Sequence, residues 1–446
     1  MIKKVLIANR GEIALRIIRA CKELNIPTVA VYSTADALSL HVRFADEAVC
    51  IGPADAKNSY LKTSQIISAA ELTNADAIHP GYGFLAENAD FAQMCEDNEI
   101  NFIGPKSNVI RMMGNKAVAR KTVKHTGVPV IPGSDDVVTD FADLQKTVQN
   151  IGYPVIIKAA AGGGGRGMRV VRADADLENA FLTAQEESRV AFGNSDLYVE
   201  KLIEDARHIE VQIIGDNFGE IAYLGERECS IQRRHQKLIE ESPSPAMTPE
   251  LREKVGKYAV KIARAVGYSS AGTIEFLMNS DRKFYFMEMN TRIQVEHPVT
   301  EMVTGIDLLK EQILLADNNK MPKWLKKFKL RGHAIECRIN AEDPRRNFLP
   351  TPGMITAFHA PGGPGIRVDT HVYAGYEIPF NYDSLLAKLI AHGKNREESL
   401  ARMGRALEEM IIEGVSTTVS FHQAILRDKS FREGKFTTGF LNTFQY

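Results

Sequence analysis

The first hundred residues alternate short apolar runs with segments in which apolar positions recur at helical spacing. The apolar runs predict strands at Lys4–Ala8, Thr28–Tyr32, 77–79 and 100–103, and the helical segments between them are Glu12–Leu24, Ser64–Leu72 and Phe91–Asn98. Strands that alternate with helices are typical of a parallel sheet with crossover helices. We therefore predict a doubly wound α/β domain over residues 1–114. Its first turn, Asn9–Glu12, lacks the three glycines of a dinucleotide fingerprint, which argues against NAD.

The hydrophobic pattern changes at residue 115. From there to about Asp317, helices are followed by pairs of strands, which predicts a central α+β domain over residues 115–329. Strands dominate the remainder, residues 330–446, with predicted strands at His333–Asn340, Met354–His359 and Gly365–Asp369 before a predicted helix-rich end at Arg396–Gly414. The chain therefore predicts a multidomain α/β and α+β protein.

The composition excludes several classes of protein. A formal net charge of -1 over 446 residues gives no field that would attract nucleic acid or an anionic membrane. The five cysteines are scattered without a CxxC pair, which argues against a disulfide framework or a zinc site. The apolar run behind Met1 stops at Asn9 and is too short for a signal peptide, and no run reaches the length of a membrane span. We expect a cytoplasmic location.

A glycine run, Gly162–Gly167, lies between two predicted strands, Tyr153–Lys158 and Met168–Val171. A P-loop would end in Gly-Lys-Ser/Thr and open a helix, so this run predicts a hairpin instead. Glycine backbone can fold its N–H groups around phosphate oxygens, and Lys158 supplies a cation where the loop begins. The alternative is a surface hairpin without a ligand, but four consecutive glycines favour the phosphate site.

Two acidic residues fall at matching places in a predicted hairpin. If Gly272–Met278 and Phe284–Asn290 pair about Asp281, Glu275 lies opposite Glu288, at about 5 Å. Like charges at that distance repel, and a cation between them removes the conflict. Oxygen ligands suit Mg2+ that bridges nucleotide phosphates. The alternative is two exposed carboxylates on a solvated face, which the aromatic and Met neighbours make weaker.

Two further patterns place polar side chains on one face. If the second strand of this hairpin stays extended, its alternate residues share a face: Glu288, Asn290, Arg292, Gln294 and Glu296. Arg292 can bind a small oxyanion, and Glu296 can act as a base beside it. On His333–Asn340, Arg338 faces away from the apolar positions. The alternative for Arg338 is an ion pair with Glu336 on an exposed strand.

The segment Glu226–Lys237 is dense in charge. Charge runs are usually solvated faces, so the segment alone indicates little. Beside a nucleotide site, His235 and Lys237 become candidates for contacts with phosphate or bicarbonate.

These motifs, in this order, resemble the biotin carboxylase family along essentially the whole chain. The motifs that carry the resemblance are Ala8–Ala14, His79–Asn88, Met113–Lys116, the glycine run, Glu226–Lys237 and Glu288–His297. The resemblance implies an ATP-grasp central domain with a mobile lid at about residues 131–203 and a barrel-like C-terminal domain. The glycine run departs from the family pattern at Ala161, where a fifth glycine is common.

The resemblance also implies a role for individual residues. It assigns ATP contacts to Lys116, Lys158, Gly164, Gly165, His208, Gln232 and His235, with Glu200, Lys201, Leu202 and Ile203 along the adenine. It assigns Mg2+ or Mn2+, as two ions, to Glu275, Glu288 and Asn290. It assigns bicarbonate to Lys237, Arg292, Gln294 and the Val295 N–H, the base to Glu296, the biotin ureido oxygen to Arg338, and a substrate contact to Tyr82.

The implied reaction is ATP-dependent carboxylation of biotin with bicarbonate through carboxyphosphate. The resemblance implies a homodimeric protein that works with a biotin carboxyl carrier protein and carboxyltransferase subunits, as in bacterial acetyl-CoA carboxylase. Alternatives are the same component of a pyruvate or propionyl-CoA carboxylase, or another ATP-grasp ligase such as a carbamoyl phosphate synthetase or a purine-pathway carboxylase. A nucleotide-binding regulatory module without activity is an alternative of a different class, which the intact set of charged residues disfavours.

Overall fold

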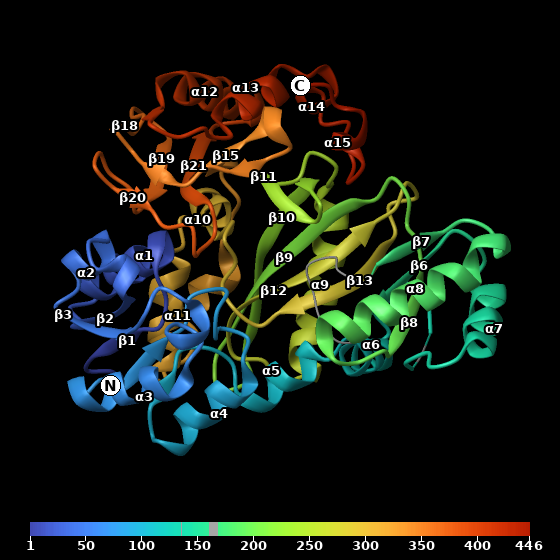
Figure 1. Ribbon diagram of the computed structural model, residues 1–446, viewed down its shortest axis with the longest axis horizontal. Helices are drawn as coiled ribbons and strands as arrows, with labels where there is room; N and C mark the ends of the chain where they lie inside the picture. Colours follow the sequence, from blue (N-terminus) through green and yellow to red (C-terminus); the bar gives the residue numbers. More distant parts are fainter. Residues whose placement is uncertain (135, 160–167) are drawn as a thin grey trace.

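The computed structural model describes residues 1–134, 136–159 and 168–446 (Figure 1). The N-terminal domain is built on a parallel sheet of order β3-β2-β1-β4-β5. Because β1 has neighbours on both sides, the chain winds outward in two directions, and the doubly wound prediction is confirmed. Its elements are β1 (Val5–Ile7), α1 (Gly11–Glu23), β2 (Thr28–Ser33), α2 (Leu40–Phe44), β3 (Glu47–Gly52), α3 (Thr63–Thr73), β4 (Ala77–His79), α4 (Ala89–Asp97), β5 (Asn101–Phe102) and α5 (Ser107–Gly114).

The sequence did not predict β3. Its residues Glu47–Gly52 are largely exposed or half-buried at the edge of the sheet, so no continuous apolar run marks the strand.

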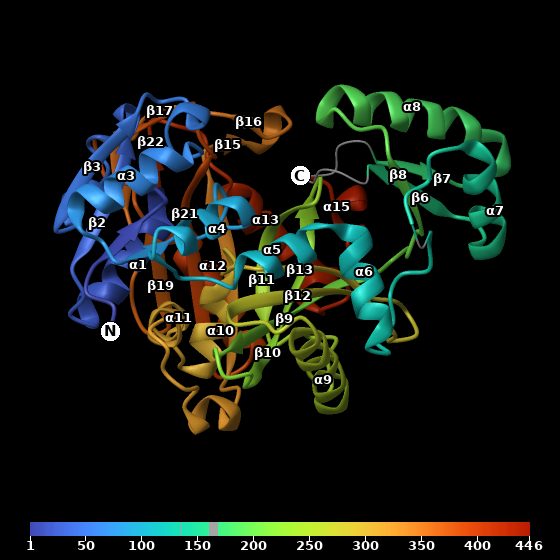
Figure 2. The same cartoon turned by 90° about the horizontal axis from the view of Figure 1, so that it is seen from below.

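A small antiparallel sheet of order β7-β6-β8 forms a separate unit of the central domain. Figure 2 shows this unit standing to one side of the main body, covered by α7 and α8. It has its own hydrophobic core, in which Leu144 and Val148 of α7 lie with Val155 and Val199 of the sheet. The predicted strands on either side of the glycine run pair as β6 and β7. The elements are α7 (Phe141–Ile151), β6 (Val155–Ala159), β7 (Arg169–Val171), α8 (Asp174–Phe192) and β8 (Leu197–Lys201).

The main body of the central domain contains five long strands and four helices. Asn115 caps α6 by accepting a hydrogen bond from the Val118 N–H at 3.1 Å, and this fixes the helix start that carries Lys116. The elements are α6 (Lys116–His125), β9 (Arg207–Gly215), β10 (Ile221–Arg233), β11 (Gln236–Ser242), α9 (Pro249–Ala265), β12 (Ser270–Met278), β13 (Phe284–Asn290), α10 (His297–Thr304) and α11 (Leu308–Ala316).

These strands continue into the C-terminal domain. A single antiparallel sheet has the order β13-β12-β9-β10-β11-β14-β21-β19, and the pair β11–β14 joins the two domains. The C-terminal elements are β14 (His333–Asn340), β15 (Glu342–Asp343), β16 (Leu349–Pro350), β17 (Gly353–Met354), β18 (Ala357–His359), β19 (Ile366–Thr370), β20 (Glu377–Ile378), β21 (Leu385–Gly393), α12 (Arg396–Glu409), β22 (Ile411–Glu413), α13 (Val419–Arg427), α14 (Lys429–Arg432) and α15 (Phe440–Thr443).

One C-terminal prediction is wrong in detail. The expected strand Met354–His359 is broken into β17 and β18, which pair with different partners. The predicted helix-rich end is confirmed, with α12 to Glu409, after which Ile411–Glu413 forms β22 and pairs with β18.

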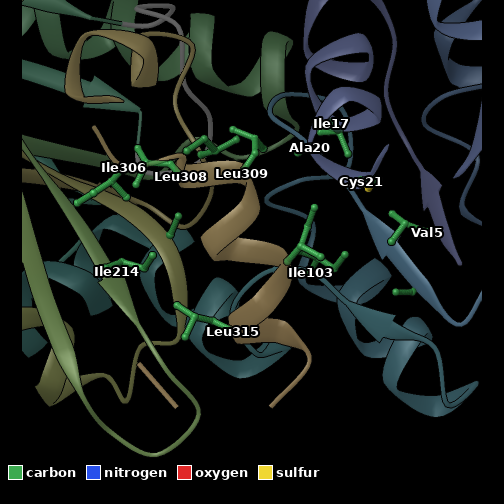
Figure 3. Close-up of a cluster of buried hydrophobic side chains, with 14 of the residues drawn as sticks. Val5, Ile17, Ala20, Cys21, Ile103, Ile214, Ile306, Leu308, Leu309 and Leu315 are labelled. Atoms are coloured by element: carbon green, nitrogen blue, oxygen red, sulfur yellow. The ribbon is translucent and has the colours of Figure 1, made fainter. Parts of the chain in front are cut away.

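The N-terminal and central domains share a hydrophobic core. Figure 3 shows Ile17, Ala20 and Cys21 of α1 near Leu308 and Leu309 of α11. Cys21 has no exposed surface and lies within this core. No helix in the described parts of the chain combines the length and apolar character needed to cross a membrane.

Candidate active site

A cavity of about 1360 Å³ lies where the three domains meet. Tyr82 contributes to its wall from the N-terminal domain, Lys237 from the central domain and Arg338 from the C-terminal domain. The predicted site residues that the structure describes line this cavity, with one exception. Glu296 lies behind the wall, in contact with Lys237 and Arg338, and is only 1% exposed. Gly164, Gly165 and Ala161 lie outside the described residues.

A row of charged side chains beside the cavity crosses four adjacent strands. Glu288 of β13 is opposite Glu275 of β12, as predicted, and Glu275 is opposite Glu210 of β9. Glu210 is in turn opposite Arg227 of β10. Residues in register on neighbouring strands share a face of the sheet, so three carboxylates and one guanidinium form a continuous row.

Glu210 and Arg227 were not predicted. Arg227 has no exposed surface, and its Nε donates to Glu210 while Nη1 donates to Gln212 Oε1 at 2.7 Å. A local signal for Glu210 existed, because His208, Glu210 and Gln212 alternate with apolar residues along β9.

Lys237 neutralises the centre of this row. Its Nζ donates to Glu210 Oε2 at 2.5 Å, Glu275 Oε1 at 3.0 Å and Glu296 Oε1 at 2.6 Å. Burial alone would lower the pKa of Lys237, but these three carboxylates hold it well above its usual range. The ammonium therefore stays charged inside the protein, where an anionic ligand can reach it from the cavity.

Glu275 and Glu288 differ in their surroundings. Burial alone would raise the pKa of Glu275, but Lys237 and His208 outweigh burial and lower it below its ordinary value. Burial and the charge of Glu275 both raise the pKa of Glu288, and the charge of Lys116 is the largest influence that opposes them. Glu288 is therefore the carboxylate whose charge is least compensated, and a divalent cation between the two residues would compensate it. The pair fits a metal ion.

Asn290 fits the metal site less directly. Its Nδ2 donates to Glu275 Oε1 at 2.8 Å, and its Oδ1 accepts from Arg292 Nη2 at 3.1 Å. The amide oxygen that would bind a metal is thus engaged by Arg292. One lone pair of this oxygen remains for a metal ion, so Asn290 can act as a ligand only while sharing its oxygen with Arg292.

The residues predicted to contact ATP include Lys158 and the segment Glu200–Ile203, and both line one end of the cavity, called the nucleotide end below after this prediction. Lys158 Nζ donates to Glu200 Oε2 at 2.6 Å, and Arg120 Nη1 donates to Glu200 Oε1 at 3.1 Å. Burial alone would raise the pKa of Glu200, but Lys158 and its other partners lower it. The ion pair with Glu200 thereby holds the Lys158 side chain in place at the cavity wall.

Backbone groups along this segment are only partly available to a base edge. The N–H groups of Lys201 and Leu202 donate to Pro132 O at 2.7 Å and Pro154 O at 3.0 Å. The groups of this segment that remain for contacts with adenine are therefore its carbonyl groups and the Ile203 N–H. No backbone partner of the Ile203 N–H is found in the described parts of the chain.

His208, Gln232 and His235 lie between the nucleotide end and the row of carboxylates. His208 Nε2 is 2.7 Å from Glu275 Oε2, and its Nδ1 is 3.1 Å from Gln232 Nε2. Burial alone would lower the pKa of His208, but Glu275 outweighs it and raises the pKa. Burial, with Lys158 and His208 nearby, lowers the pKa of His235. His208 can therefore supply positive charge, while His235 is a neutral donor.

The prediction of an extended strand to Glu296 is wrong. β13 ends at Asn290, and Glu296 is the N-cap of α10 with φ -81° and ψ 12°. The chain turns instead, and the turn brings Arg292 Nη1 to 2.8 Å from Gln294 Oε1. Gln294 Nε2 donates to Glu275 Oε1 at 2.9 Å. The predicted residues therefore converge, but through a loop rather than through strand periodicity.

Glu87 fixes the orientation of Arg292. Glu87 belongs to the motif His79–Asn88, but no role was predicted from the sequence for Glu87 itself. Arg292 Nε donates to Glu87 Oε2 at 2.8 Å, and Glu87 also accepts from the Thr291 N–H at 3.0 Å. Burial alone would lower the pKa of Arg292, but Glu87 outweighs it. The guanidinium is held at the cavity wall with a fixed orientation.

Arg338 points into the same end of the cavity from β14. Ile335, Cys337 and Ile339 are fully buried in the C-terminal core, so the predicted division of the strand into two faces is confirmed. Arg338 Nε donates to Glu240 Oε1 at 2.6 Å, and its Nη2 donates to Glu296 Oε2 at 2.9 Å. The alternative of an exposed pair with Glu336 is wrong, because Glu336 has no exposed surface.

The pKa values of the two carboxylates beside Arg338, Glu240 and Glu296, are shifted in opposite directions. Burial, assisted by the charge of Glu296, raises the pKa of Glu240 to about 7 despite Arg338. Burial alone would also raise the pKa of Glu296, but Lys237, Arg338 and Arg227 hold it well below its usual range. Glu296 is therefore ionised and able to accept a proton. Its basicity increases only when a ligand weakens the contacts to Lys237 and Arg338.

Comparison with known proteins agrees with this geometry. Residues 1–110 match the biotin carboxylase N-terminal domain, residues 115–324 match the ATP-binding domain of the carbamoyl-phosphate synthase L chain, and residues 336–443 match the biotin carboxylase C-terminal domain. The chain is 57% identical over 445 residues to biotin carboxylase 1 of Bacillus subtilis (strain 168), and the match covers 100% of this chain and 99% of the relative. The chain belongs to the biotin carboxylase family.

Two other relatives are similar over nearly the whole chain. One of the pyruvate carboxylase subunits of Methanothermobacter thermautotrophicus is 54% identical, and the match covers 100% of this chain and 90% of the relative. The biotin carboxylase domain dimer of Hydrogenobacter thermophilus 2-oxoglutarate carboxylase, solved with MgADP, ADP and bicarbonate, has a TM-score of 0.95 and 50% identity, with 99% of this chain and 97% of that chain covered.

The flanking domains decide between ATP-grasp activities. The model matched by the central domain is named after carbamoyl-phosphate synthase, whereas both other domains match models specific to biotin carboxylase. The chain is thus an ATP-grasp ligase of the biotin-carboxylating kind rather than a carbamoyl phosphate synthetase. ATP-dependent carboxylation of biotin is its activity.

Proposed function

We propose that this chain carboxylates biotin on a carrier protein with ATP and bicarbonate, and that the residues of the cavity divide the work as the sequence predicted. The observation that carries the proposal is a single cavity with phosphate-binding cations at one end and Arg292, Lys237 and Arg338 at the other, with Glu275 and Glu288 between them. The solved 2-oxoglutarate carboxylase domain, titled as a complex with MgADP and bicarbonate, supports the same pair of ligands.

At the nucleotide end, Lys116, Lys158, His208 and His235 bind ATP phosphates, with Gln232 holding His208. The phosphates compete with Glu200 for Lys158, so this ion pair opens when nucleotide binds. Gly164 and Gly165 remain proposed phosphate contacts from the sequence, and residues 131–203 remain the proposed lid. Mg2+ or Mn2+, held by Glu275 and Glu288 with Asn290, would offset the charge of the β- and γ-phosphates.

At the other end, Arg292, the Gln294 amide, Lys237 and the Val295 N–H bind bicarbonate. Glu296 removes its proton, and the resulting oxyanion attacks the γ-phosphorus as the bond to ADP breaks. Carboxyphosphate then separates into CO2 and phosphate where water is excluded. The phosphate removes the ureido proton, Arg338 stabilises the enolate-like oxygen, and the biotin nitrogen bonds to CO2. Tyr82 forms part of the biotin pocket.

The proposed partners are a biotin carboxyl carrier protein and carboxyltransferase subunits in the cytoplasm, with the chain as a homodimer. The first candidate is the acetyl-CoA carboxylase system of fatty-acid synthesis, as the sequence resemblance implies, and the 57% identity to biotin carboxylase 1 of Bacillus subtilis is consistent with it. The similarity to a pyruvate carboxylase component favours pyruvate as the second candidate acceptor. Transfer of labelled carboxylate to acetyl-CoA or to pyruvate, in the presence of each set of partner proteins, distinguishes the two.

The test of the half-reaction is ADP release by the purified chain. We expect ADP release to depend on both bicarbonate and free biotin. Release that requires an amine in place of biotin would support another ATP-grasp ligase. Nucleotide binding without turnover under any of these conditions would support a regulatory module and overturn the proposal.

A further inference from the structure

One ammonium group of the C-terminal domain is completely buried beside the bicarbonate end of the cavity. Lys388 lies in the middle of β21, and its side chain has no exposed surface. Lysine is almost never fully buried unless it is paired, because removing its charge from water is costly. The roles assigned above do not include Lys388.

The Lys388 ammonium joins all three domains. Its Nζ donates to the Val295 carbonyl oxygen at 3.0 Å, in the loop that leads into α10. It also lies 3.0 Å from Glu12 Oε1, on α1 of the N-terminal domain. The same Glu12 oxygen accepts a hydrogen bond from the Tyr82 hydroxyl, and Tyr82 lines the cavity. A continuous path of two hydrogen bonds and one ion pair therefore runs from the cavity wall through Glu12 and Lys388 to Val295.

The Val295 carbonyl is the point at which this path can affect chemistry. α10 begins at His297 with Glu296 as its N-cap, so the carbonyl of Val295 precedes the helix and takes no part in its hydrogen bonds. Fixing this carbonyl fixes the plane of the peptide between Val295 and Glu296. The plane sets ψ of Val295 and φ of Glu296, and with them the direction in which the Glu296 side chain leaves the backbone.

We propose that Lys388 is a positioning residue that orients Val295 and Glu296 for bicarbonate and couples them to Glu12 and Tyr82. The proposal rests on the function proposed above. It gives a role to Glu12, which belongs to the motif Ala8–Ala14. None of the residues assigned above to nucleotide or bicarbonate comes from that motif. In register across the sheet, Lys388 lies between Arg338 and Asp369, so it is on the same face as the arginine assigned to biotin.

The alternative is that Lys388 only neutralises buried carboxylates. Asp369 has a closer partner, because Arg367 Nη2 is 2.7 Å from Asp369 Oδ2 while Lys388 Nζ is 3.9 Å away. Burial raises the pKa of Glu336 well above its usual range, so this carboxyl is neutral and does not require a cation. Glu12 is the one nearby carboxylate for which Lys388 is the closest cation among the described residues. If Lys388 served only to balance charge, neutralising Glu12 would therefore compensate for the loss of Lys388.

This gives a test in two variants. Lys388→Met removes the ammonium and keeps the length of the side chain, and the double variant Lys388→Met/Glu12→Gln also removes the charge that would be left unpaired. Lys394→Met, at an exposed position just beyond β21, is the matched control. The measurements are KM for bicarbonate, KM for ATP and kcat in biotin-dependent ADP release, with ADP affinity by calorimetry and thermal unfolding of each variant.

We expect the bicarbonate KM of both Lys388 variants to rise by about 10- to 100-fold, the loss expected for one hydrogen bond to a charged group. KM for ATP and ADP affinity should stay within about twofold, because the nucleotide end does not contact this path, and Lys394→Met should match the wild type. A folded double variant with the wild-type bicarbonate KM, altered only in Tm or in kcat, would overturn the proposal. Wild-type ADP release that needs neither bicarbonate nor biotin would instead overturn the proposed function.

Discussion

Replacement of Glu296 by glutamine tests the base assigned to bicarbonate. The carboxylate is 1% exposed, with Oε1 2.6 Å from Lys237 Nζ and Oε2 2.9 Å from Arg338 Nη2. Glutamine has nearly the same shape and keeps one oxygen as an acceptor. It loses the negative charge and the ability to accept a proton, so the change separates chemistry from packing.

The cost in stability follows from the contacts that remain. Removing one partner of a buried ion pair costs about 3–5 kcal/mol when the other charge is left alone. Here Lys237 keeps Glu210 and Glu275, and Arg338 keeps Glu240, so neither cation is left without a carboxylate. We therefore expect Glu296→Gln to lower the free energy of unfolding by about 1–3 kcal/mol, the range for a hydrogen bond to a charged group.

The expected kinetic effect is much larger. Loss of a general base typically lowers turnover by about 10²- to 10⁴-fold. The nucleotide contacts at Lys116 and Lys158 are separate from Glu296, so ADP affinity should change by less than about threefold. Biotin-dependent ADP release and calorimetric binding of ADP measure the two quantities on the same preparation.

Glu311→Gln is the matched control, because Glu311 is a buried glutamate of α11 that does not line the cavity. It should leave turnover within about twofold of the wild type, the change expected away from the site. Turnover of Glu296→Gln at the wild-type level would remove Glu296 from the role of base. Equal losses of ADP affinity and turnover would show that its role is structural.

Three further predictions follow from other contacts. Glu288→Gln should raise the Mg2+ concentration for half-maximal ADP release at least about tenfold, because it removes one anionic ligand, whereas metal-free ADP binding should be unchanged. Glu210→Gln should lower the free energy of unfolding in urea by about 3–5 kcal/mol, because it removes the only carboxylate that Arg227 contacts among the described residues, and an equal midpoint would contradict this. The pKa of Asp36 is lowered to about 2, because the effect of Arg10 outweighs that of burial. The ion pair of Asp36 and Arg10 therefore stabilises the fold at pH values above the pKa of Asp36 in the unfolded chain. This contribution disappears as the pH falls toward 2. The stability lost in Asp36→Asn should therefore be largest near neutral pH, at about 2 kcal/mol, and should shrink on acidification.

The sequence predicted those features that depend on local pattern. The hairpin of β12 and β13 and the pairing of Glu275 with Glu288 follow from strand alternation about one short turn. The continuous sheet through β11 and β14 could not be predicted in this way, because the two strands are separated by about ninety residues and neither carries a signal for the other. The same holds for Glu87 beside Arg292 and Glu240 beside Arg338.

The error beyond Asn290 had a local cause that could have been recognised. Pro298 occupies the first turn of α10, a position that proline favours, so a helix start was encoded immediately after Glu296. A strand cannot run directly into that start without a turn. The residues nevertheless converge, because Gln294 and Arg292 hydrogen-bond to Glu275 and Asn290 across the loop. Hydrogen bonds between side chains therefore bring the predicted residues together even though the predicted backbone was wrong.

The number of carboxylates in a cavity for two anionic substrates has a physical explanation. Three cations that face the cavity are each held by a carboxylate: Lys158 by Glu200, Arg292 by Glu87, and Arg338 by Glu240. These carboxylates keep the three cations oriented before any ligand arrives, so binding requires little reorganisation. Glu288 is different, because it lies beside another carboxylate and has no cation within ion-pair distance among the described residues. If Glu288 binds the metal ion as proposed, the charge that remains there explains why the nucleotide would arrive with a divalent cation rather than alone.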